Sequence, residues 1–334
     1  MRSFLCALAL AGPLAADTGQ DLSAAIERND LTAVRSALQQ GADVNAKDAT
    51  ATTPLMQAAV YSTPECMKLL LDKGADPKAR NEAGATALMW GIGDPAKVRL
   101  LVERGADVNA RSKAGKTPLL LASRHPGSIE IVKLLLVKGA DIRATDPSGA
   151  NAATVAAGSG DVTILKHLIT AGADVKSTLK ASQIVVPNTA SEIRETQVER
   201  ATRIASGFTA LMAAASGRHT GAARLLIEHG VDVNASTGSG LTALILAASL
   251  GEPALVKLLL DNGANVNVKE ERGYTPLILA AGADARNVEV VRMLIAKGAD
   301  LKAKGNNGET ALTWAKKMGE TPVVKLLKEA GAPE

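Results

Sequence analysis

The sequence predicts an all-α fold, a solenoid of stacked helix-turn-helix units. Two observations lead to this prediction: a Thr-Pro-Leu or Thr-Ala-Leu step recurs in register along the chain, and a glycine recurs after an apolar run at a spacing close to 33 residues. One such unit cannot bury its own apolar stripe, so it must stack on its neighbours. The low aromatic content of 2% against 46% hydrophobic residues agrees, because closely stacked helices are filled mainly by Ala, Leu and Val.

The unit is clearest at residues 53–76. Thr53 can cap a helix, and Pro54 suits the first helical turn because it lacks an N–H that would be unpaired there. The run of leucines at 69–71 predicts a second helix with a wide apolar stripe. Gly74 supplies the positive φ that ends this second helix before a turn.

The pattern returns nearly to the end of the chain. Its glycine recurs at Gly41, Gly74, Gly105, Gly139, Gly172, Gly230, Gly263, Gly298 and Gly331. Its capping residue recurs at Thr53, Thr86, Thr117, Thr209, Thr242, Thr275 and Thr310, with Asn151 as a degenerate copy. This pattern resembles the ankyrin repeat over about residues 21 to 333, with about nine repeats. The resemblance implies β-hairpin-like finger loops and a concave face, made of finger tips and first helices, that binds protein partners.

The sequence departs from the family pattern at one position. The family usually places His after Thr-Pro-Leu, whereas this chain has Met56, Met89, Leu120, Thr154, Met212, Ile245, Ile278 and Thr313. We expect apolar packing to replace part of the polar network between repeats.

The two ends of the chain predict its organisation. Residues 1–16 combine Arg2 with a short apolar run and small residues, which is typical of a secretory signal peptide, with a disordered leader as the alternative. The mature chain would then start near Asp17 and be exported, to a bacterial periplasm, with a cytoplasmic location as the alternative. Residues 17–334 are expected to form a single ankyrin-repeat domain with an insertion at about 178–204. No stretch reaches the roughly 20 apolar residues of a membrane span.

No constellation in the sequence predicts chemistry. The four histidines, His125, His167, His219 and His229, fall at different phases of the repeat, so no metal site is expected. Loss of the leader would leave Cys66 as the single cysteine, best interpreted as a buried structural thiol. No catalytic motif or phosphate loop is present, so we expect no cofactor and no enzyme activity. The net charge of +4 is spread among acidic residues, which argues against a nucleic-acid partner.

The insertion interrupts the finger between two repeats. Its first half is broken by Pro187 and looks extended, and its second half has the capping-box spacing of Thr189 and Glu192 followed by a helical apolar face. Two interpretations stay open: a tolerated surface loop, or a binding element on the face where repeat insertions often lie.

The candidate partner site lies next to this insertion. Phe208, Leu241 and Tyr274 each stand just before a capping Thr, at spacings of 33 and 33. Stacking would place them side by side as an exposed apolar stripe on the concave face, although such residues can instead merely cover neighbouring repeats. The expected polar rim consists of Arg272, Glu271 and Asn307.

The sequence therefore predicts a non-catalytic protein–protein interaction module, expected to be a monomer, that holds a protein partner on its concave face. The alternatives are a ligand-binding or enzymatic accessory protein with a site formed by the insertion, and an intracellular effector or regulator if the leader is retained.

Overall fold

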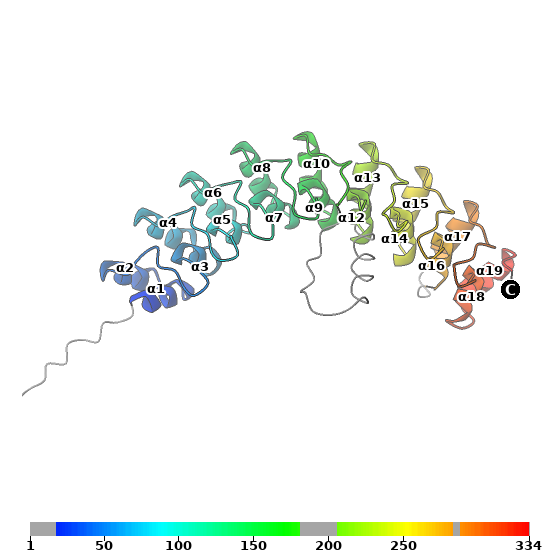
Figure 1. Ribbon diagram of the computed structural model, residues 1–334, viewed down its shortest axis with the longest axis horizontal. Coiled ribbons are helices and arrows are strands. Elements are labelled where there is room, and N and C mark those ends of the chain that lie inside the picture. Colours follow the sequence, from blue (N-terminus) through cyan, green and yellow to red (C-terminus); the bar gives the residue numbers. More distant parts are fainter. Residues whose placement is uncertain (1–17, 181–205, 283–287, 334) are drawn as a thin grey trace, which may run out of the picture. The chain divides into compact units, whose positions relative to one another are not determined.

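The computed structural model describes residues 18–180, 206–282 and 288–333, and these residues are helical with connecting turns (Figure 1). This confirms the predicted all-α solenoid of helix pairs. The finger loops are turns rather than strands, and in the described part of the chain an isolated antiparallel bridge joins Thr178 to Thr209. The chain divides into two compact units, residues 1–113 (unit 1) and 114–334 (unit 2), and each is described by itself.

Both units consist of helix pairs in which a first helix is followed by a second. Unit 1 contains α1 (Thr18–Glu27), α2 (Leu31–Gln39), α3 (Pro54–Tyr61), α4 (Pro64–Asp72), α5 (Ala87–Trp90) and α6 (Pro95–Glu103). Unit 2 contains α7 (Pro118–Arg124), α8 (Ile129–Val137), α9 (Ala152–Ser159), α10 (Val162–Thr170), α12 (Ala210–Ser216), α13 (Thr220–Glu228), α14 (Ala243–Leu250), α15 (Pro253–Asp261), α16 (Pro276–Gly282), α17 (Val288–Ala296), α18 (Ala311–Lys316) and α19 (Pro322–Glu329).

The capping residues start the first helices as the sequence predicts. The Thr209 Oγ1 accepts a hydrogen bond from the backbone N of Met212 at 3.2 Å, which satisfies one of the unpaired N–H groups at the start of α12. The degenerate copy works equally well, because the Asn151 Oδ1 accepts from the N of Thr154 at 2.9 Å. We therefore number positions in each repeat from the capping residue: position −1 precedes it, and +4 and +7 follow it along the first helix.

The core of unit 2 lies between the layer of first helices and the layer of second helices. First helices contact each other in sequence, α7 with α9, α9 with α12, α12 with α14, α14 with α16 and α16 with α18. At the position where the family usually has His, Met212, Ile245 and Ile278 are each only 1% exposed, which confirms the apolar packing expected there.

Asparagine side chains add a polar connection between second-helix turns that the sequence analysis did not predict. The Asn234 Nδ2 donates to the carbonyl of Gly263 at 2.9 Å, and its Oδ1 accepts from the N of Asn265 at 2.8 Å. Asn267 makes the same two bonds to Gly298 and Asp300 in the next repeat. Each amide thus satisfies a carbonyl and an N–H in the turn that follows a second helix of the next repeat.

Candidate functional site

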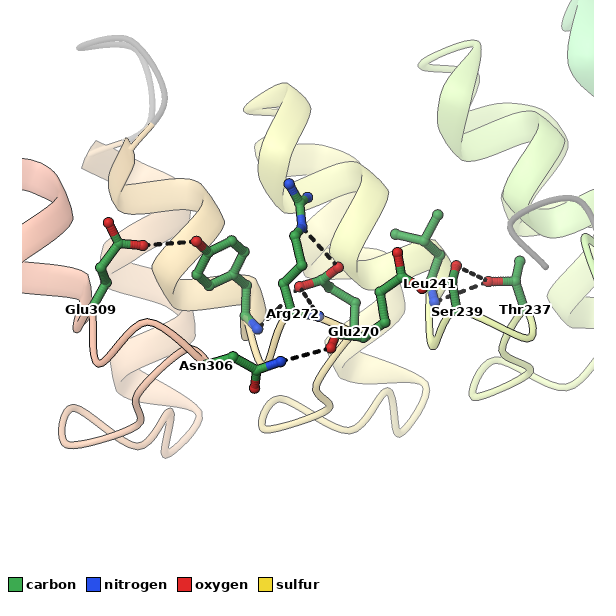
Figure 2. Close-up of polar contacts among 9 residues, drawn as sticks. Thr237, Ser239, Leu241, Glu270, Arg272, Asn306 and Glu309 are labelled. Carbon is green, nitrogen blue, oxygen red and sulfur yellow. Dashed lines mark hydrogen bonds and ion pairs between the residues drawn. The ribbon is translucent and has the colours of Figure 1, made fainter. Parts of the chain in front are cut away.

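The predicted partner site lies on the finger turns of unit 2, and Figure 2 shows two of these turns, each closed by a side chain. The Thr237 Oγ1 accepts from the backbone N of Leu241 at 3.1 Å. In the next finger, the Glu270 Oε1 accepts from the N of Arg272 at 2.9 Å and from the N of Tyr274 at 3.2 Å. The buried Glu270 side chain therefore fixes the backbone on both sides of the fingertip.

Backbone hydrogen bonds connect neighbouring finger turns. The N of Gly238 donates to the carbonyl of Ser206 at 2.9 Å, and the N of Glu271 donates to that of Ser239 at 2.8 Å. In the next finger, the backbone N of Asn306 donates to the carbonyl of Arg272, also at 2.8 Å. We call these bonds the finger ladder. It keeps equivalent positions of successive repeats in register, as the predicted stripe requires.

Tyr274 is buried, so the predicted exposure of this residue is wrong. Its side chain is 5% exposed, and its ring meets Trp314 edge-on with centroids 4.4 Å apart and planes at 79°. The Tyr274 hydroxyl donates to the Glu309 Oε2 at 2.7 Å, which raises the pKa of the tyrosine (Figure 2). The pKa of Glu309 is lowered by its bond to Lys317 and then by the one from Tyr274. Phe208 and Leu241 are half-buried.

The predicted polar rim is exposed but partly engaged. Arg272 lies 5.2 Å above the Tyr274 ring, and its Nε pairs with the Glu270 Oε2 at 3.3 Å. Glu271 is exposed and its carbonyl accepts from the Asn306 Nδ2 at 2.9 Å (Figure 2). Asn307 is exposed at the next fingertip. These residues form a polar edge beside Tyr274 rather than around an exposed aromatic ring.

A second row of apolar side chains, which the sequence analysis missed, lies on the first helices of unit 2. Position +4 is partly exposed in every repeat of this unit, whereas most of its neighbours on the helix are buried. We call this set the +4 row: Leu121, Val155, Ala213, Leu246, Leu279 and Trp314. The signal was in the sequence, because these residues follow the capping residues at a constant offset.

At two repeat boundaries of unit 2, the +4 residue of one repeat lies against a glycine at position +7 of the preceding repeat. A Cβ built on Gly282 would stand 2.2 Å from the Trp314 Nε1, so only glycine leaves room for the indole. A Cβ built on Gly158 would lie 3.6 Å from the Cβ of Ala213, an ordinary contact. The sizes of the side chains at +7 and at +4 of the next repeat thus determine how much of the space between two first helices is filled.

The smallest such pair lies beside a pocket of about 580 Å³. Its lining is mostly apolar and includes Pro126, Ala150, Val155, Gly158, Leu179, Phe208 and Ala213. Phe208, predicted as a site residue, therefore lies in a pocket, whereas Leu241 and Tyr274 do not line it. Leu179 and Phe208 are joined by a backbone hydrogen bond of 2.7 Å from the N of Leu179.

The polar part of the lining consists of Arg124, Thr154, Ser159 and His219. Arg124 is exposed at the end of α7. The His219 ring fits a slot between two glycines: a Cβ would stand 2.3 Å from its Nδ1 at Gly160 and 2.4 Å from its Cδ2 at Gly217. Any side chain at either glycine would displace the imidazole.

Comparison with known proteins gives the family. A model described as ankyrin repeats, in three copies, matches residues 22–112, 93–179, 183–270 and 255–333. The chain belongs to the ankyrin repeat family. It is also 34% identical over 154 residues to zygote-specific protein 3 of Chlamydomonas reinhardtii, an alignment that covers 46% of this chain and 33% of that protein. The chain thus spans about a third of the length of this curated relative. Ankyrin repeats are generally non-catalytic protein–protein interaction modules.

The ankyrin repeats of unit 1 carry exposed apolar residues of their own, which the sequence analysis also missed. Val60 and Tyr61 at the end of α3 are 48% and 57% exposed, and Trp90 at the end of α5 is 36% exposed. In the same unit Lys97 is buried, and its Nζ donates to the carbonyl of Ala59, which precedes Val60, at 3.0 Å. This ammonium satisfies a carbonyl at the C-terminal end of α3.

The described ankyrin repeats show no group of three or more His, Cys, Asp or Glu side chains that could hold a metal ion. In the same residues, no helix is both long and apolar enough to cross a bilayer. Cys66 is a free, buried thiol whose pKa is raised by burial. The predicted insertion at 178–204 lies mostly outside the described residues. Its first three residues, 178–180, belong to the finger, because the N of Lys180 donates to the carbonyl of Ser148 at 2.8 Å.

Proposed function

We propose that this ankyrin repeat protein is a non-catalytic interaction module, and that its partner is a protein bound on the finger–helix face of unit 2. We use this term for the surface formed by the finger turns and the +4 row. The observation that carries the proposal is the +4 row, because six equivalent, mostly apolar side chains remain partly exposed while most residues beside them are buried. A contiguous exposed apolar surface with a polar edge is typical of a protein interface.

The finger ladder supports the proposal, because it holds this face in one shape before a partner arrives. Neighbouring fingertips are connected through the backbone, so little conformational freedom remains to be lost on binding. The side chains that close the turns, Thr237 and Glu270, act in the same way.

A photo-crosslinking experiment in the native compartment tests the proposal. A benzoylphenylalanine at Leu246 lies on the finger–helix face, and one at Val137, which is 82% exposed on second helix α8, provides the matched control. We expect a discrete crosslinked partner at position 246 that is lost when Leu279 is replaced by Lys, and no such product at position 137. Crosslinking at position 137 alone would show that this face is not the interface.

A deletion variant distinguishes this proposal from the alternative function, a site formed by the insertion. In this variant a short Gly-Ser linker replaces residues 181–205. The ends of this segment are close, since the N of Gly207 donates to the carbonyl of Leu179 at 2.9 Å. We expect this chain to give the same crosslink at position 246. Loss of the crosslink in a chain that still folds would favour the insertion.

We also propose that the protein is exported to a bacterial periplasm and that the mature chain begins near Asp17. The support is the sequence of residues 1–16, with Arg2, an apolar run and the small residues Ala15 and Ala16. Sequencing of the N-terminus of the exported protein checks this. An intact Met1 recovered from the cytoplasm would instead favour the intracellular effector.

A further inference from the structure

The C-terminal end of unit 2 shows how an aromatic side chain fills the space between two first helices. Trp314, at +4 of its repeat, lies against Gly282, at +7 of the preceding one, where no Cβ could fit. The edge-on contact with Tyr274, at position −1 of that preceding repeat, closes the other side at 4.4 Å. Positions −1 and +7 of one repeat therefore hold the indole that stands at +4 of the next, so three positions define the site.

The same three positions at the boundary between the repeats of α9 and α12 carry Ala150, in the finger before α9, Gly158, in α9, and Ala213, in α12. None of these side chains is larger than a methyl group, and all three line the pocket of about 580 Å³. The pocket thus lies where the repeat pattern places an aromatic ring at the C-terminal end of unit 2. Its volume is in the range typical of ligand pockets.

We infer that this pocket binds an aromatic side chain of an acidic peptide segment in the partner protein. The inference rests on the proposed function and specifies the chemistry of the partner. Val155, Leu179 and Phe208 supply the apolar surface, and one aromatic residue buries roughly 150 to 250 Å² in such a site. A buried aromatic anchor is the usual centre of a protein interface.

The charges around the pocket select for acidic neighbours of that aromatic residue. No carboxylate among the described residues lines the pocket, whereas Arg124 does. The ion pairs within the described part of the chain do not involve Arg124. Nearby carboxylates are engaged elsewhere: Asp161 accepts from the N of Gly127 at 2.8 Å, and Asp146 accepts from the Lys116 Nζ at 2.6 Å. A guanidinium binds a carboxylate through two parallel hydrogen bonds, which favours Glu or Asp beside the anchor.

Substitution of Ala213 provides a test that preserves the repeat pattern. Ala213→Trp places an indole at +4 with a glycine, Gly158, at +7, as Trp314 and Gly282 already do. We expect the new side chain to fill the pocket without loss of thermal stability. Val137→Trp adds the same side chain at an exposed position on α8 and is the matched control.

The probes are fluorescein-labelled peptides with one Trp flanked by Glu on both sides, together with versions in which Ala replaces Trp or Lys replaces Glu. With the full chain, fluorescence anisotropy should show the Glu-flanked Trp peptide binding at least tenfold more tightly than either other peptide. Ala213→Trp should weaken binding of the Glu-flanked Trp peptide at least tenfold, and Val137→Trp should leave this affinity unchanged. Arg124→Gln, an exposed change that keeps the fold, should reduce the preference for Glu over Lys flanks by about tenfold.

The opposite results overturn the inference separately from the proposed function. Equal affinity for the Trp and Ala peptides, or unchanged binding to a folded Ala213→Trp chain, would show that the pocket does not hold the aromatic ring. If no peptide binds while the crosslink at position 246 persists, the finger–helix face remains the interface and the acidic aromatic partner is wrong. Peptide binding that requires removal of residues 181–205 would assign the pocket to that segment of the chain and not to a partner.

Discussion

At the scale of single residues, Asp146 shows how one side chain closes a finger turn. Its Oδ1 accepts from the backbone N of Ser148 at 2.9 Å and of Ala150 at 3.1 Å, and its Oδ2 accepts from the Lys116 Nζ at 2.6 Å. Burial alone would raise the pKa of this carboxyl, but the hydrogen bonds from Lys116 and Ser148 outweigh it and lower the pKa below its usual value. The side chain is 10% exposed, so solvent screens these bonds little.

We predict that Asp146→Asn reduces the free energy of unfolding by about 1 to 3 kcal/mol at pH 7, because a hydrogen-bonded charge is lost. A carboxyl whose folded pKa is depressed stabilises the fold above its unfolded pKa, near 3.9, and this contribution disappears as the pH falls through the folded pKa. The difference between variant and wild type should therefore shrink below about pH 4 in urea titrations. A difference that stays constant down to pH 2 would contradict this account.

Glu329→Gln is the control for Asp146→Asn. Its carboxylate is 61% exposed and lies 3.9 Å from the Lys325 Nζ. Such a surface pair contributes between zero and about 1 kcal/mol, so we expect little change at any pH.

Tyr274 shows what the sequence could not reveal at this scale. Its position just before Thr275, and its alignment with Phe208 and Leu241, followed from the spacing of the repeats. Its burial depends on Trp314, which stands at position +4 of the next repeat, whereas Tyr274 stands at position −1 of its own repeat. Periodicity indicates which residues are equivalent, but contact between different phases depends on how neighbouring helices pack. The pocket was missed for the same reason, since it results from small side chains at three different phases.

At the scale of elements, the finger ladder is interrupted at Pro147. Lys180, Gly238 and Glu271 donate their backbone N–H to the preceding finger at the equivalent position, and proline has no N–H to donate. The Pro147 ring instead packs against Gly115, where a Cβ would stand 2.5 Å from its Cδ. The helices themselves were predictable from the capping Thr and the terminal glycine, because both act within a few residues.

We predict that Gly115→Ala destabilises the protein more than Gly105→Ala does. Both glycines have positive φ, +69° and +85°, which costs an alanine about 1 to 2 kcal/mol. Only Gly115 adds a clash with a rigid ring, whereas nothing lies within 4 Å of a Cβ at Gly105. Denaturant unfolding of the two variants measures the difference. Equal losses would mean that the finger shifts to accommodate the methyl group.

At the scale of the whole molecule, stability is distributed over contacts between neighbouring repeats. The described residues contain one free, buried cysteine and no candidate metal cluster, and the largest fully buried side chains are leucine, isoleucine and methionine. The regular spacing predicted a single domain over 17–334, which stays a prediction. Spacing alone could not predict that the chain divides into two compact units between residues 113 and 114.

We predict that neither chelators nor reductants change the thermal stability of the mature chain. Packing of helix on helix has no dependence on a metal or on a disulfide, so EDTA and dithiothreitol should leave the melting temperature where it is. Leu135→Ala, at a fully buried position of α8, should lower the free energy of unfolding by about 2 to 5 kcal/mol and is the positive control. A clear fall in melting temperature with either reagent would reveal a stabilising group that the repeats alone do not provide.

The pairing of +7 with +4 also has a consequence for how this surface can evolve. Because the repeats share one backbone plan, a hollow between first helices is created or closed by the identity of two or three side chains. Position 158 already carries glycine, as position 282 does, so the pair Gly158 and Ala213 becomes equivalent to Gly282 and Trp314 by one replacement, Ala213→Trp. New ligand preferences can therefore arise by single amino-acid replacements at a repeat boundary, with no insertion, no rearranged helix and no loss of the existing core.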